Sequence, residues 1–273
     1  MSPPIAVVTG ATEGIGKETA VALLRKGFLV VVHGRSETRA QEAADDLASS
    51  NVDIAVADFS SMKQTRTMGD ALAKKHPRID VLINNAGVFA KTRTVTEDGF
   101  ELTLAVNHFA HFVLTHALIG ALGAADQGRI VHVASGVHSS GQVDLDDLTF
   151  EHHFGGYEAY ASSKLMNVLF SNELSRRLHG TRITSNALHP GVIATKLLRS
   201  GFGGGGASVE SGARTSVKVA TDPALAKTTG AYFSDEREVA PGARAKDPKL
   251  ARALYEKSCA LTGTTPLALE GTA

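Results

Sequence analysis

Short runs of apolar, often β-branched residues alternate along the chain with longer segments whose apolar positions recur at helical spacing. This alternation predicts a parallel sheet with helices on both faces. The runs are almost wholly apolar rather than alternately polar, which is typical of strands buried on both sides. We therefore expect one doubly wound α/β domain over residues 1–273, with seven parallel strands at residues 5–9, 29–33, 52–57, 81–84, 130–134, 183–189 and 231–233.

A glycine-rich turn follows the first predicted strand. The segment TGATEGIG, residues 9–16, precedes a helix expected over residues 17–26. Free N–H groups and the positive dipole end of a helix N-terminus attract phosphate, and glycines let the backbone approach it. The turn is therefore predicted to bind the pyrophosphate of a dinucleotide, although a purely structural tight turn uses the same residues. Its expected contact residues are Gly10, Thr12, Glu13, Gly14, Ile15 and Gly16.

The ends of the second and third strands indicate which dinucleotide binds. An NAD enzyme usually has an acidic residue after the second strand, whereas this chain reads VHGR and ends on Arg35. A guanidinium can bind the 2′-phosphate of NADP, and no carboxylate is there to repel it. NADP(H) is therefore favoured over NAD(H), with a solvated Arg35 as the alternative. Asp58, followed by Phe59, is expected to hydrogen-bond the adenine edge or to cap the next helix.

A tyrosine and a lysine one helical turn apart form a candidate catalytic pair. Tyr160 and Lys164, in YASSK, lie at the start of a predicted helix and share one face. A phenol with a pKa of about 10 is a poor base at neutral pH, and a nearby ammonium should lower that pKa. Tyr160 is thus expected to act as acid or base, although an ordinary amphipathic helix can show the same spacing. Tyr157 is a weaker candidate, because its one-turn partner is Ala161.

Further polar elements follow the fourth and fifth strands. NNAG, residues 84–87, ends the fourth strand, and Ser135 follows the fifth. With the glycine turn, Asn107 and the Tyr160/Lys164 pair, they closely resemble the short-chain dehydrogenase/reductase family, in the same order over nearly the whole chain. Residues 106–111, 141–178 and 187–197 resemble its retinol dehydrogenase and WW-domain oxidoreductase branch. The resemblance implies a single-domain Rossmann fold.

The same resemblance implies a catalytic tetrad of Asn107, Ser135, Tyr160 and Lys164. Asn107 would hold a helix distortion and a water that links Lys164 to solvent, and Ser135 would hydrogen-bond the substrate oxygen. Tyr160 would transfer the proton while a hydride moves between nicotinamide and a ketone, aldehyde or alcohol. Glu13 departs from the basic residue of many NADP-preferring relatives, so the NADP prediction depends mainly on Arg35. The resemblance adds as cofactor-binding residues Asn85, Ala86, Gly87, Tyr160, Lys164, Pro190, Gly191, Val192 and Thr195.

Composition excludes several kinds of partner. The chain has 28 Lys+Arg and 28 Asp+Glu, so no net charge would gather nucleic acid. Its single cysteine, Cys259, excludes an internal disulfide and fits a reducing compartment. Neither a secretory leader nor an apolar run of about 20 residues is evident. We expect a cytoplasmic oxidoreductase with a small-molecule carbonyl or alcohol substrate and no nucleic-acid or membrane partner.

Several features are open to more than one interpretation. His108, His111 and His116 have a spacing that could hold a metal, but a buried helix is the preferred interpretation, and no metal is expected. Residues 100–122 and 157–178 are expected to pair copies into a homodimer or homotetramer. The alternative to an enzyme is a non-catalytic dinucleotide-binding regulatory or scaffold protein, which would be expected to lose tetrad members. Two loops are expected to shape the substrate site, at residues 141–156 and 197–212, and the tail at residues 262–273 is expected to cover the pocket or to fray.

Overall fold

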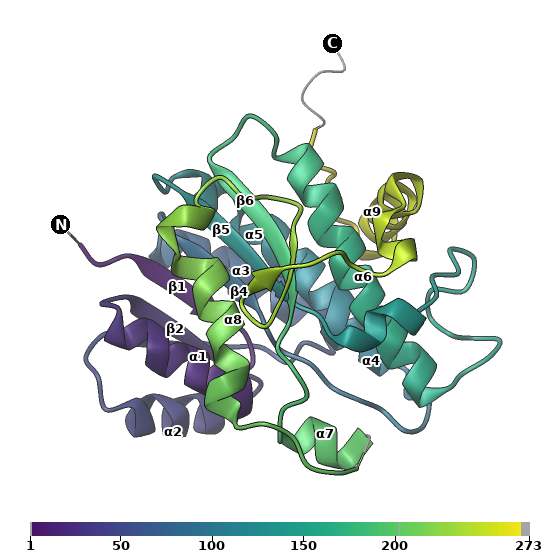
Figure 1. Cartoon of the computed structure of the whole chain (residues 1–273), viewed down its shortest axis with the longest axis horizontal. Coiled ribbons are helices and arrows are strands. Elements are labelled where there is room, and N and C mark those ends of the chain that lie inside the picture. Colours follow the sequence, from purple (N-terminus) through teal and green to yellow (C-terminus); the bar gives the residue numbers. More distant parts are fainter. Residues whose placement is uncertain (1, 202, 269–273) are drawn as a thin grey trace.

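A single sheet forms the centre of the computed structural model, which describes residues 2–201 and 203–268. The strand order is β3-β2-β1-β4-β5-β6-β7-β8 (Figure 1). The order reverses between β1 and β4, so the crevice at the carboxyl ends of these two strands is the switch point where doubly wound folds bind ligands. The strands are β1 Ile5–Val8, β2 Leu29–Gly34, β3 Val52–Val56, β4 Val81–Asn84, β5 Gly128–Val133, β6 Ile183–His189, β7 Tyr232–Ser234 and β8 Arg237–Glu238.

The seven predicted strands are present and parallel, and β8 adds a short antiparallel edge strand. Asp235 and Glu236 connect β7 to β8 with φ values of 50° and 60°. Two consecutive left-handed residues are typical of a two-residue hairpin turn. Both residues of β8 are exposed, so no apolar pattern marks the strand in the sequence. The predicted fold class is confirmed, with one strand more than expected.

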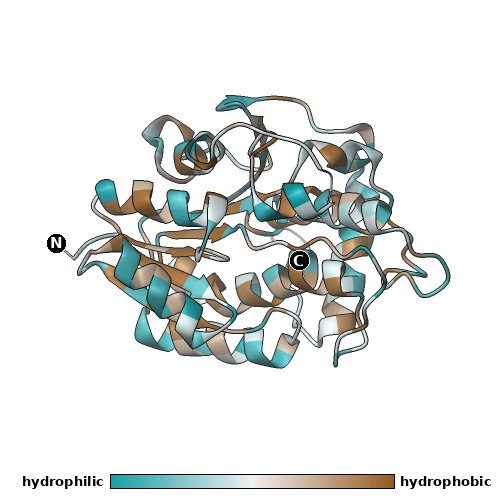
Figure 2. Cartoon of the chain, turned by 90° about the horizontal axis from the view of Figure 1, so that it is seen from below, coloured by the Kyte–Doolittle hydropathy of each residue, from teal (hydrophilic) through white to brown (hydrophobic). Residues whose placement is uncertain are grey.

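Helices cover both faces of the sheet. Helices α1, α2 and α8 lie on one face and α3, α5 and α6 on the other, with α9 packed outside α6 (Figure 1). Along β1, Val7 faces the α3/α5/α6 core while Ala6 and Val8 face the opposite core. Figure 2 shows the hydrophobic strands between helices whose outer surfaces are hydrophilic. The helices are α1 Gly14–Arg25, α2 Glu37–Leu47, α3 Met62–Lys75, α4 Leu102–Leu104, α5 Ala110–Gly123, α6 Gly156–Arg177, α7 Lys196–Gly201, α8 Val209–Thr221 and α9 Pro248–Thr262.

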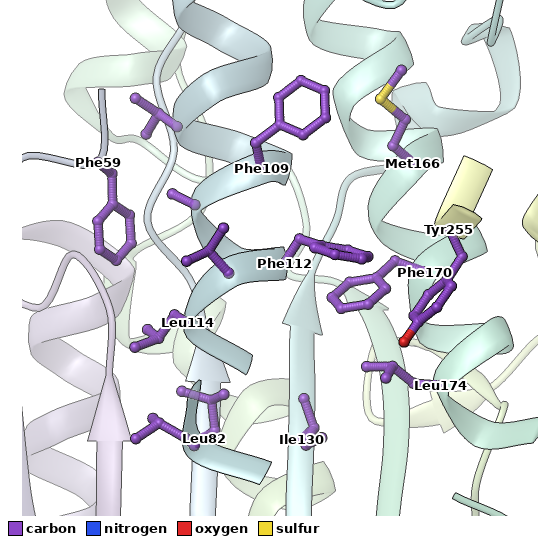
Figure 3. Close-up of a cluster of buried hydrophobic side chains, with 14 of the residues drawn as sticks. Phe59, Leu82, Phe109, Phe112, Leu114, Ile130, Met166, Phe170, Leu174 and Tyr255 are labelled. Atoms are coloured by element: carbon purple, nitrogen blue, oxygen red, sulfur yellow. The ribbon is translucent and has the colours of Figure 1, made fainter. Parts of the chain in front are cut away.

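An aromatic cluster joins α9 to the core (Figure 3). The ring of Phe112 in α5 lies 4.8 Å from that of Phe170 in α6 and 5.2 Å from that of Tyr255 in α9. The guanidinium of Arg177 covers the Tyr255 ring at 3.9 Å. These contacts bury part of the α6 surface on which the sequence predicts pairing between copies, and the pairing itself stays a prediction.

The expectation that no apolar run approaches 20 residues was wrong, because the segment Leu102–Gly123 is long and apolar enough to cross a membrane, by length and composition alone. In this fold 78% of its most apolar window is buried inside the protein. Its hydrophobic character is therefore accounted for by core packing.

The described part of the predicted tail lies away from the crevice. Leu267 N donates to the Tyr255 hydroxyl at 2.9 Å, and the Leu267 carbonyl oxygen accepts from Arg177 Nη1 at 2.6 Å. Arg177 is seventeen residues along α6 from Tyr160, a span of about 25 Å at the helical rise per residue. Residues up to 268 therefore do not cover the predicted catalytic pair, and Leu269 lies outside the described residues.

Candidate active site

The glycine turn connects β1 to α1 at the switch point. Helix α1 begins at Gly14, so the N–H groups of its first turn point toward the crevice without intrahelical acceptors. Gly10 has a φ of 63°, and a Cβ on it would lie 2.8 Å from the Ala86 backbone. A Cβ on Gly16 would lie 2.3 Å from the carbonyl oxygen of Gly10. The turn is thus open to a phosphate and too tight for side chains at these two glycines.

The end of β2 packs against this turn. His33 Nδ1 accepts from Gly10 N at 3.1 Å, so its Nε2 carries the proton that is donated to Ala57 O at 3.0 Å. Burial lowers the pKa of His33 to about 4, which keeps the ring neutral. Arg35, directly after the strand, is exposed. His33 was not singled out by sequence reasoning, because nothing in VHGR marks it as the ring that supports the turn.

The predicted adenine-side residues have different environments. Asp58 Oδ1 accepts from the backbone N–H of Ser60 at 2.9 Å and from its hydroxyl at 2.8 Å, which forms a local turn before α3. The cap of α3 is Ser61, so Asp58 does not cap that helix. The Phe59 ring is buried in the core (Figure 3). It stacks on the His33 ring with a centroid distance of 4.1 Å, so a contact from Phe59 to a cofactor would have to come from its main chain.

The NNAG element is fastened to the glycine turn through Thr9. The Thr9 hydroxyl oxygen accepts from Asn85 N at 2.8 Å and from Ala86 N at 2.9 Å. The Asn85 side chain donates back to Thr9 O at 2.7 Å. A Cβ on Gly87 would lie 3.5 Å from both Asn107 Oδ1 and Lys164 Nζ. The structure therefore brings the predicted cofactor turn and the predicted tetrad to the same crevice.

Asn107 lies in a π-helical turn, Ala105–Phe109, between α4 and α5. Its Oδ1 accepts from Val88 N at 2.8 Å, and its Nδ2 donates to Val88 O and Ser163 Oγ, both at 3.0 Å. Its carbonyl oxygen accepts from His111 Nδ1 at 3.0 Å. The helix distortion implied for Asn107 is present in the structure, and the Asn107 side chain joins this turn to Val88 and to α6.

His111 also reaches the glycine turn. Because its Nδ1 donates to a carbonyl, its Nε2 must accept in the neutral ring, and Thr9 Oγ1 lies 3.2 Å away. The Thr9 proton has a second acceptor, Ile83 O at 3.3 Å, which already accepts from Thr9 N. Burial holds the pKa of His111 well below its usual value, so the ring stays neutral. His111 is another contributor that sequence reasoning considered only as a metal ligand or a core residue.

Tyr160, Ser135 and Lys164 meet at the carboxyl end of β5. Tyr160 and Lys164 lie in the first turns of α6, and the Lys164 ammonium is 5.6 Å from the centroid of the Tyr160 ring. Lys164 Nζ also donates to Val133 O at 3.0 Å. Ser135 hydrogen-bonds the Tyr160 side chain. Ser135 and Lys164, two members of the predicted tetrad, therefore both lie beside the Tyr160 side chain.

The pKa of Tyr160 runs opposite to the prediction from spacing. Burial raises the pKa of Tyr160 to about 12, and the Ser135 hydrogen bond only partly offsets this rise. Burial also lowers the pKa of Lys164 to about 8. The expected net lowering of the Tyr160 pKa was therefore wrong for the cofactor-free protein, because both groups are desolvated and burial disfavours the charged form of each.

The segment after β6 folds back over the glycine turn. Gly191 has a φ of 96°, and a Cβ on Gly14 would lie 3.7 Å from Thr195 Cγ2. The neighbouring Val192 side chain is 60% exposed. Ile193 pairs with Ala207 in an isolated parallel bridge that closes the loop carrying α7. Thr195 thus lies beside the glycine turn, and Pro190, Gly191 and Val192 connect it to the carboxyl end of β6.

A match to known proteins agrees with this arrangement. The family model described as "short chain dehydrogenase" matches residues 4–202. The chain belongs to the short-chain dehydrogenase family. Human retinol dehydrogenase 13 is 38% identical, covering 94% of this chain and 84% of its own length.

Solved structures show the same family fold. An uncharacterised protein from Mycobacterium paratuberculosis has 32% identity and a TM-score of 0.83, covering 98% of this chain and 97% of its own. A structure described as an NAD(P)-dependent gluconate 5-dehydrogenase from Beutenbergia cavernae, with bound NADP, has 27% identity and a TM-score of 0.69, covering 86% and 96%. This short-chain dehydrogenase is retinol dehydrogenase-like, and its family assigns it to the nicotinamide-dependent oxidoreductases that act on CH–OH or C=O groups.

In this short-chain dehydrogenase, Glu13 ties the glycine turn to two other elements. Its carboxylate pairs with Lys196 at the start of α7 and with Arg39 of α2, the latter at 3.3 Å. The Lys196 hydrogen bond is the largest of the effects that lower the pKa of Glu13. Glu13 therefore connects the glycine turn with the loop that carries α7, a contact that its position in the turn motif did not suggest.

From the sequence we expected no metal at His108, His111 and His116, the three histidines of one helical segment. His108 Nε2 lies 3.0 Å from Ser258 Oγ, and His116 Nε2 lies 2.8 Å from the Tyr255 hydroxyl. Within residues 2–201 and 203–268, no three His, Cys, Asp or Glu side chains form a group that could hold a metal. In the described part of this short-chain dehydrogenase, the three rings make hydrogen bonds within the core instead.

Proposed function

We propose that this short-chain dehydrogenase is an NADP(H)-dependent carbonyl reductase, with Tyr160 as the general acid and alcohol oxidation as the reverse reaction. The observation that carries the proposal is the buried Tyr160 side chain, hydrogen-bonded to Ser135 and one helical turn from Lys164. With a pKa raised to about 12, Tyr160 holds its proton at neutral pH. A protonated phenol suits the reductive direction, because the carbonyl oxygen must gain a proton.

The residues of the crevice fit a dinucleotide. The first turn of α1 offers backbone N–H groups to the pyrophosphate, and Gly10 and Gly16 keep that space free of side chains. Asn85, Ala86 and Gly87 would line the path to the nicotinamide, and Lys164 would hold the adjacent ribose. When bound, the nicotinamide supplies or accepts the hydride.

The chain's own residues would handle the proton and the developing charge. Ser135 and Tyr160 would both donate hydrogen bonds to the carbonyl oxygen, and Tyr160 would release its proton as that oxygen becomes negative. The resulting phenolate would be stabilised by the Lys164 ammonium beneath the ring. Asn107, fixed by Val88 and Ser163, would hold the π turn that faces Lys164.

NADP(H) is the proposed cofactor over NAD(H). Its support is the exposed Arg35 at the end of β2, where no carboxylate opposes a 2′-phosphate. We expect Arg35→Asp to weaken NADPH binding by about 10- to 100-fold, since a hydrogen bond to a charged group contributes roughly 1.5–3 kcal/mol. NADH binding should change little. Arg25→Asp, an equally exposed position at the far end of α1, is the matched control, and an Arg35→Asp variant with wild-type NADPH affinity would overturn the assignment.

Substitution of Tyr160 tests the proposed chemistry. Tyr160→Phe should reduce kcat by roughly 10²- to 10⁴-fold, the usual contribution of a general acid, while NADPH still binds. Tyr157→Phe is the control, because Tyr157 is 47% exposed and its hydroxyl lies 3.1 Å from Ser140 Oγ. The assay would follow NADPH absorbance with retinal and a panel of aromatic and aliphatic carbonyls. Undiminished turnover by Tyr160→Phe would refute the acid/base role.

The proposed substrate is a bulky, moderately apolar carbonyl compound. The loops at residues 141–156 and 197–212 would shape the substrate site, and Val192, beside the second loop, is among the few large hydrophobic side chains that are exposed. The retinol dehydrogenase names of the relatives make retinal the first compound to test. If NADPH bound and no carbonyl were reduced, the alternative of a non-catalytic dinucleotide-binding protein would be favoured. The cytoplasmic location and the homo-oligomer stay predictions.

A further inference from the structure

The main-chain carbonyl of Ser135 accepts an unusual number of hydrogen bonds. Ser135 O lies 2.7 Å from His138 Nδ1, 3.1 Å from His138 N and 3.4 Å from the Tyr232 hydroxyl. His138 belongs to the 3-10 helix Gly136–Ser140 that follows Ser135, and it is 4% exposed. Tyr232 comes from β7, 97 residues farther along the chain. The backbone of Ser135 is thus held by side chains from two separate parts of the fold.

The hydrogen bonds determine which nitrogen of His138 carries its proton. Gly242 N donates to His138 Nε2 at 2.9 Å, so that nitrogen must have a free lone pair. In a neutral imidazole the proton is then on Nδ1, where it is donated to Ser135 O. The Tyr232 hydroxyl lies 3.3 Å from this Nδ1, which has no lone pair to offer, so the hydroxyl donates to Ser135 O as well. One tautomer satisfies every contact.

Gly242 is closely packed against the same 3-10 helix. A Cβ on Gly242 would lie 3.0 Å from the Ser139 backbone, so only glycine fits there without displacement. Arg244, two residues on, donates to Gly141 O at 3.2 Å. On the other side, His189 Nδ1 accepts from Gly136 N at 3.0 Å. The segment after Ser135 is therefore clamped between the end of β6 and residues 242–244.

We propose that His138 is a positioning residue for Ser135: the Gly242 N–H fixes its tautomer, and its Nδ1–H fixes the Ser135 carbonyl and hence the direction of the serine side chain. This inference rests on the proposed function, because it concerns the serine that would hydrogen-bond the substrate oxygen. His138 does not touch the substrate. It acts by holding the start of the turn from which Ser135 Oγ reaches Tyr160.

The neutral form of His138 is essential to this role. A second proton would occupy Nε2 and face the Gly242 N–H, which removes the acceptor. Burial lowers the pKa of His138, so protonation falls below the ordinary range near 6.5. The titratable and charged groups that face this turn are His189 from β6, Tyr232 from β7, Tyr157 and Tyr160 from α6, and Arg244 from residues 243–246.

The first test needs no activity. Long-range ¹H–¹⁵N NMR of histidine-labelled, NADPH-bound protein at neutral pH would identify the protonated ring nitrogen of each histidine. The His138 signals are those that disappear in His138→Asn. We expect the neutral tautomer of His138, with a proton on Nδ1 and an unprotonated Nε2. A proton on Nε2, or a charged ring, would overturn the proposal whatever the enzyme reduces.

A matched pair of variants separates the two contacts. The Asn amide nitrogen can occupy the place of His Nδ1, so His138→Asn keeps a donor for Ser135 O and loses the acceptor for Gly242. Gln reaches the Nε2 position, so His138→Gln keeps the Gly242 contact and loses the donor to Ser135. We expect kcat for a reduced carbonyl to fall by roughly 10- to 100-fold in His138→Gln, the effect of misplacing a reacting group by about 1 Å. His138→Asn should retain several times more activity than His138→Gln.

Further readouts exclude a general loss of structure. NADPH affinity should stay within about twofold in both variants, because His138 lies outside the turn that would bind the pyrophosphate. A tenfold change in affinity would require about 1.4 kcal/mol of binding free energy. Because protonation of His138 removes the acceptor for Gly242 N, we expect the kcat of the wild-type enzyme to fall at acidic pH with a component that His138→Asn lacks. His179→Gln, at an exposed histidine beyond the end of α6, is the control. The positioning role would be contradicted if kcat fell equally in the Asn and Gln variants. It would also be contradicted if kcat depended on acidic pH in His138→Asn as it does in wild type.

Discussion

The two sides of the crevice are built in different ways. On the cofactor side, the turn at residues 9–16 is surrounded by backbone, and a Cβ on Gly16 would lie 2.3 Å from a carbonyl oxygen. On the substrate side, every residue of α7 is at least partly exposed, and a Cβ on Gly203, Gly204 or Gly205 would meet nothing within 4 Å. At these positions the backbone of the turn is closely packed, whereas residues 203–205 have open space around them.

This difference fits what each side is proposed to bind. A pyrophosphate is recognised by main-chain N–H groups, which must be placed accurately and are fixed by burial. Thr9 and His111, both fully buried, provide that fixation from within the core. The substrate side is formed by loops on the surface, where the sequence can change without disturbing the sheet. We therefore expect substitutions on the cofactor side to affect binding and folding strongly, and equivalent ones on the substrate side to have small effects.

The largest contrast is expected between two glycine-to-alanine variants. Gly16→Ala must displace the turn and should weaken NADPH binding by more than about 100-fold, because at least two hydrogen bonds to a charged phosphate are lost. Gly205→Ala has open space and should leave NADPH affinity and carbonyl turnover within about twofold. Calorimetric titration with NADPH measures the contrast. Near-normal NADPH binding by Gly16→Ala would show that the turn is far more adaptable than its packing indicates.

The next largest effect concerns the support behind the turn. Thr9→Val removes the oxygen that accepts from Asn85 N and Ala86 N and faces His111 Nε2. Leaving buried polar groups unsatisfied costs about 1–3 kcal/mol each, so we expect about 3 kcal/mol less unfolding free energy. Ser200→Ala, on exposed α7, should change it by less than about 0.5 kcal/mol. Urea denaturation of the two variants measures the difference, and equal stabilities would contradict it.

The same contrast explains what the sequence can and cannot predict. The glycine turn, NNAG, Ser135 and the Tyr160/Lys164 pair were predicted because each is a contiguous motif at the end of a strand or the start of a helix. The partners of His138 were not predicted, since Gly242 is 104 residues away and no local pattern marks the contact. The direction of the Tyr160 pKa shift was wrong for a related reason: burial depends on packing between distant elements.

The pH dependence of stability offers a third comparison, between Lys164 and Lys196. In the folded cofactor-free protein, burial lowers the pKa of Lys164 to about 8 from its ordinary 10.5. Between these values the unfolded chain binds more protons, so the unfolding free energy should rise with pH. Tyr160, whose pKa is raised by burial, opposes this rise in unfolding free energy only above its ordinary pKa of 10.0. Measurements between pH 8 and pH 10 therefore report on Lys164.

Urea denaturation at pH 8, 9 and 10 would compare wild type with Lys164→Met and Lys196→Met. We expect the stability of wild type relative to Lys164→Met to grow by on the order of 2 kcal/mol across the window. The Lys196 side chain is 71% exposed. The unfolding free energy of Lys196→Met should therefore change with pH in parallel with that of wild type. Parallel curves for all three proteins would mean that Lys164 is solvated well enough to keep its charge.

The smallest expected effect is at the point where the two sides meet. Glu13 pairs with Lys196, and both side chains are substantially exposed, so a coupling energy of about 0.2–1 kcal/mol is expected. A double-mutant cycle of Glu13→Gln and Lys196→Gln, scored by the rate of protease cleavage within residues 197–206, measures this coupling. Each single variant should speed cleavage by about two- to fourfold, and the double variant should add little to this effect.

High salt offers a second test of the pair. It should speed cleavage of wild type by weakening the ion pair and leave the cleavage rate of the double variant unchanged, because screening acts only on charges that are present. Fully additive effects would mean that the loop over the substrate side moves independently of the cofactor turn, and the contrast between the two sides would then extend to their dynamics.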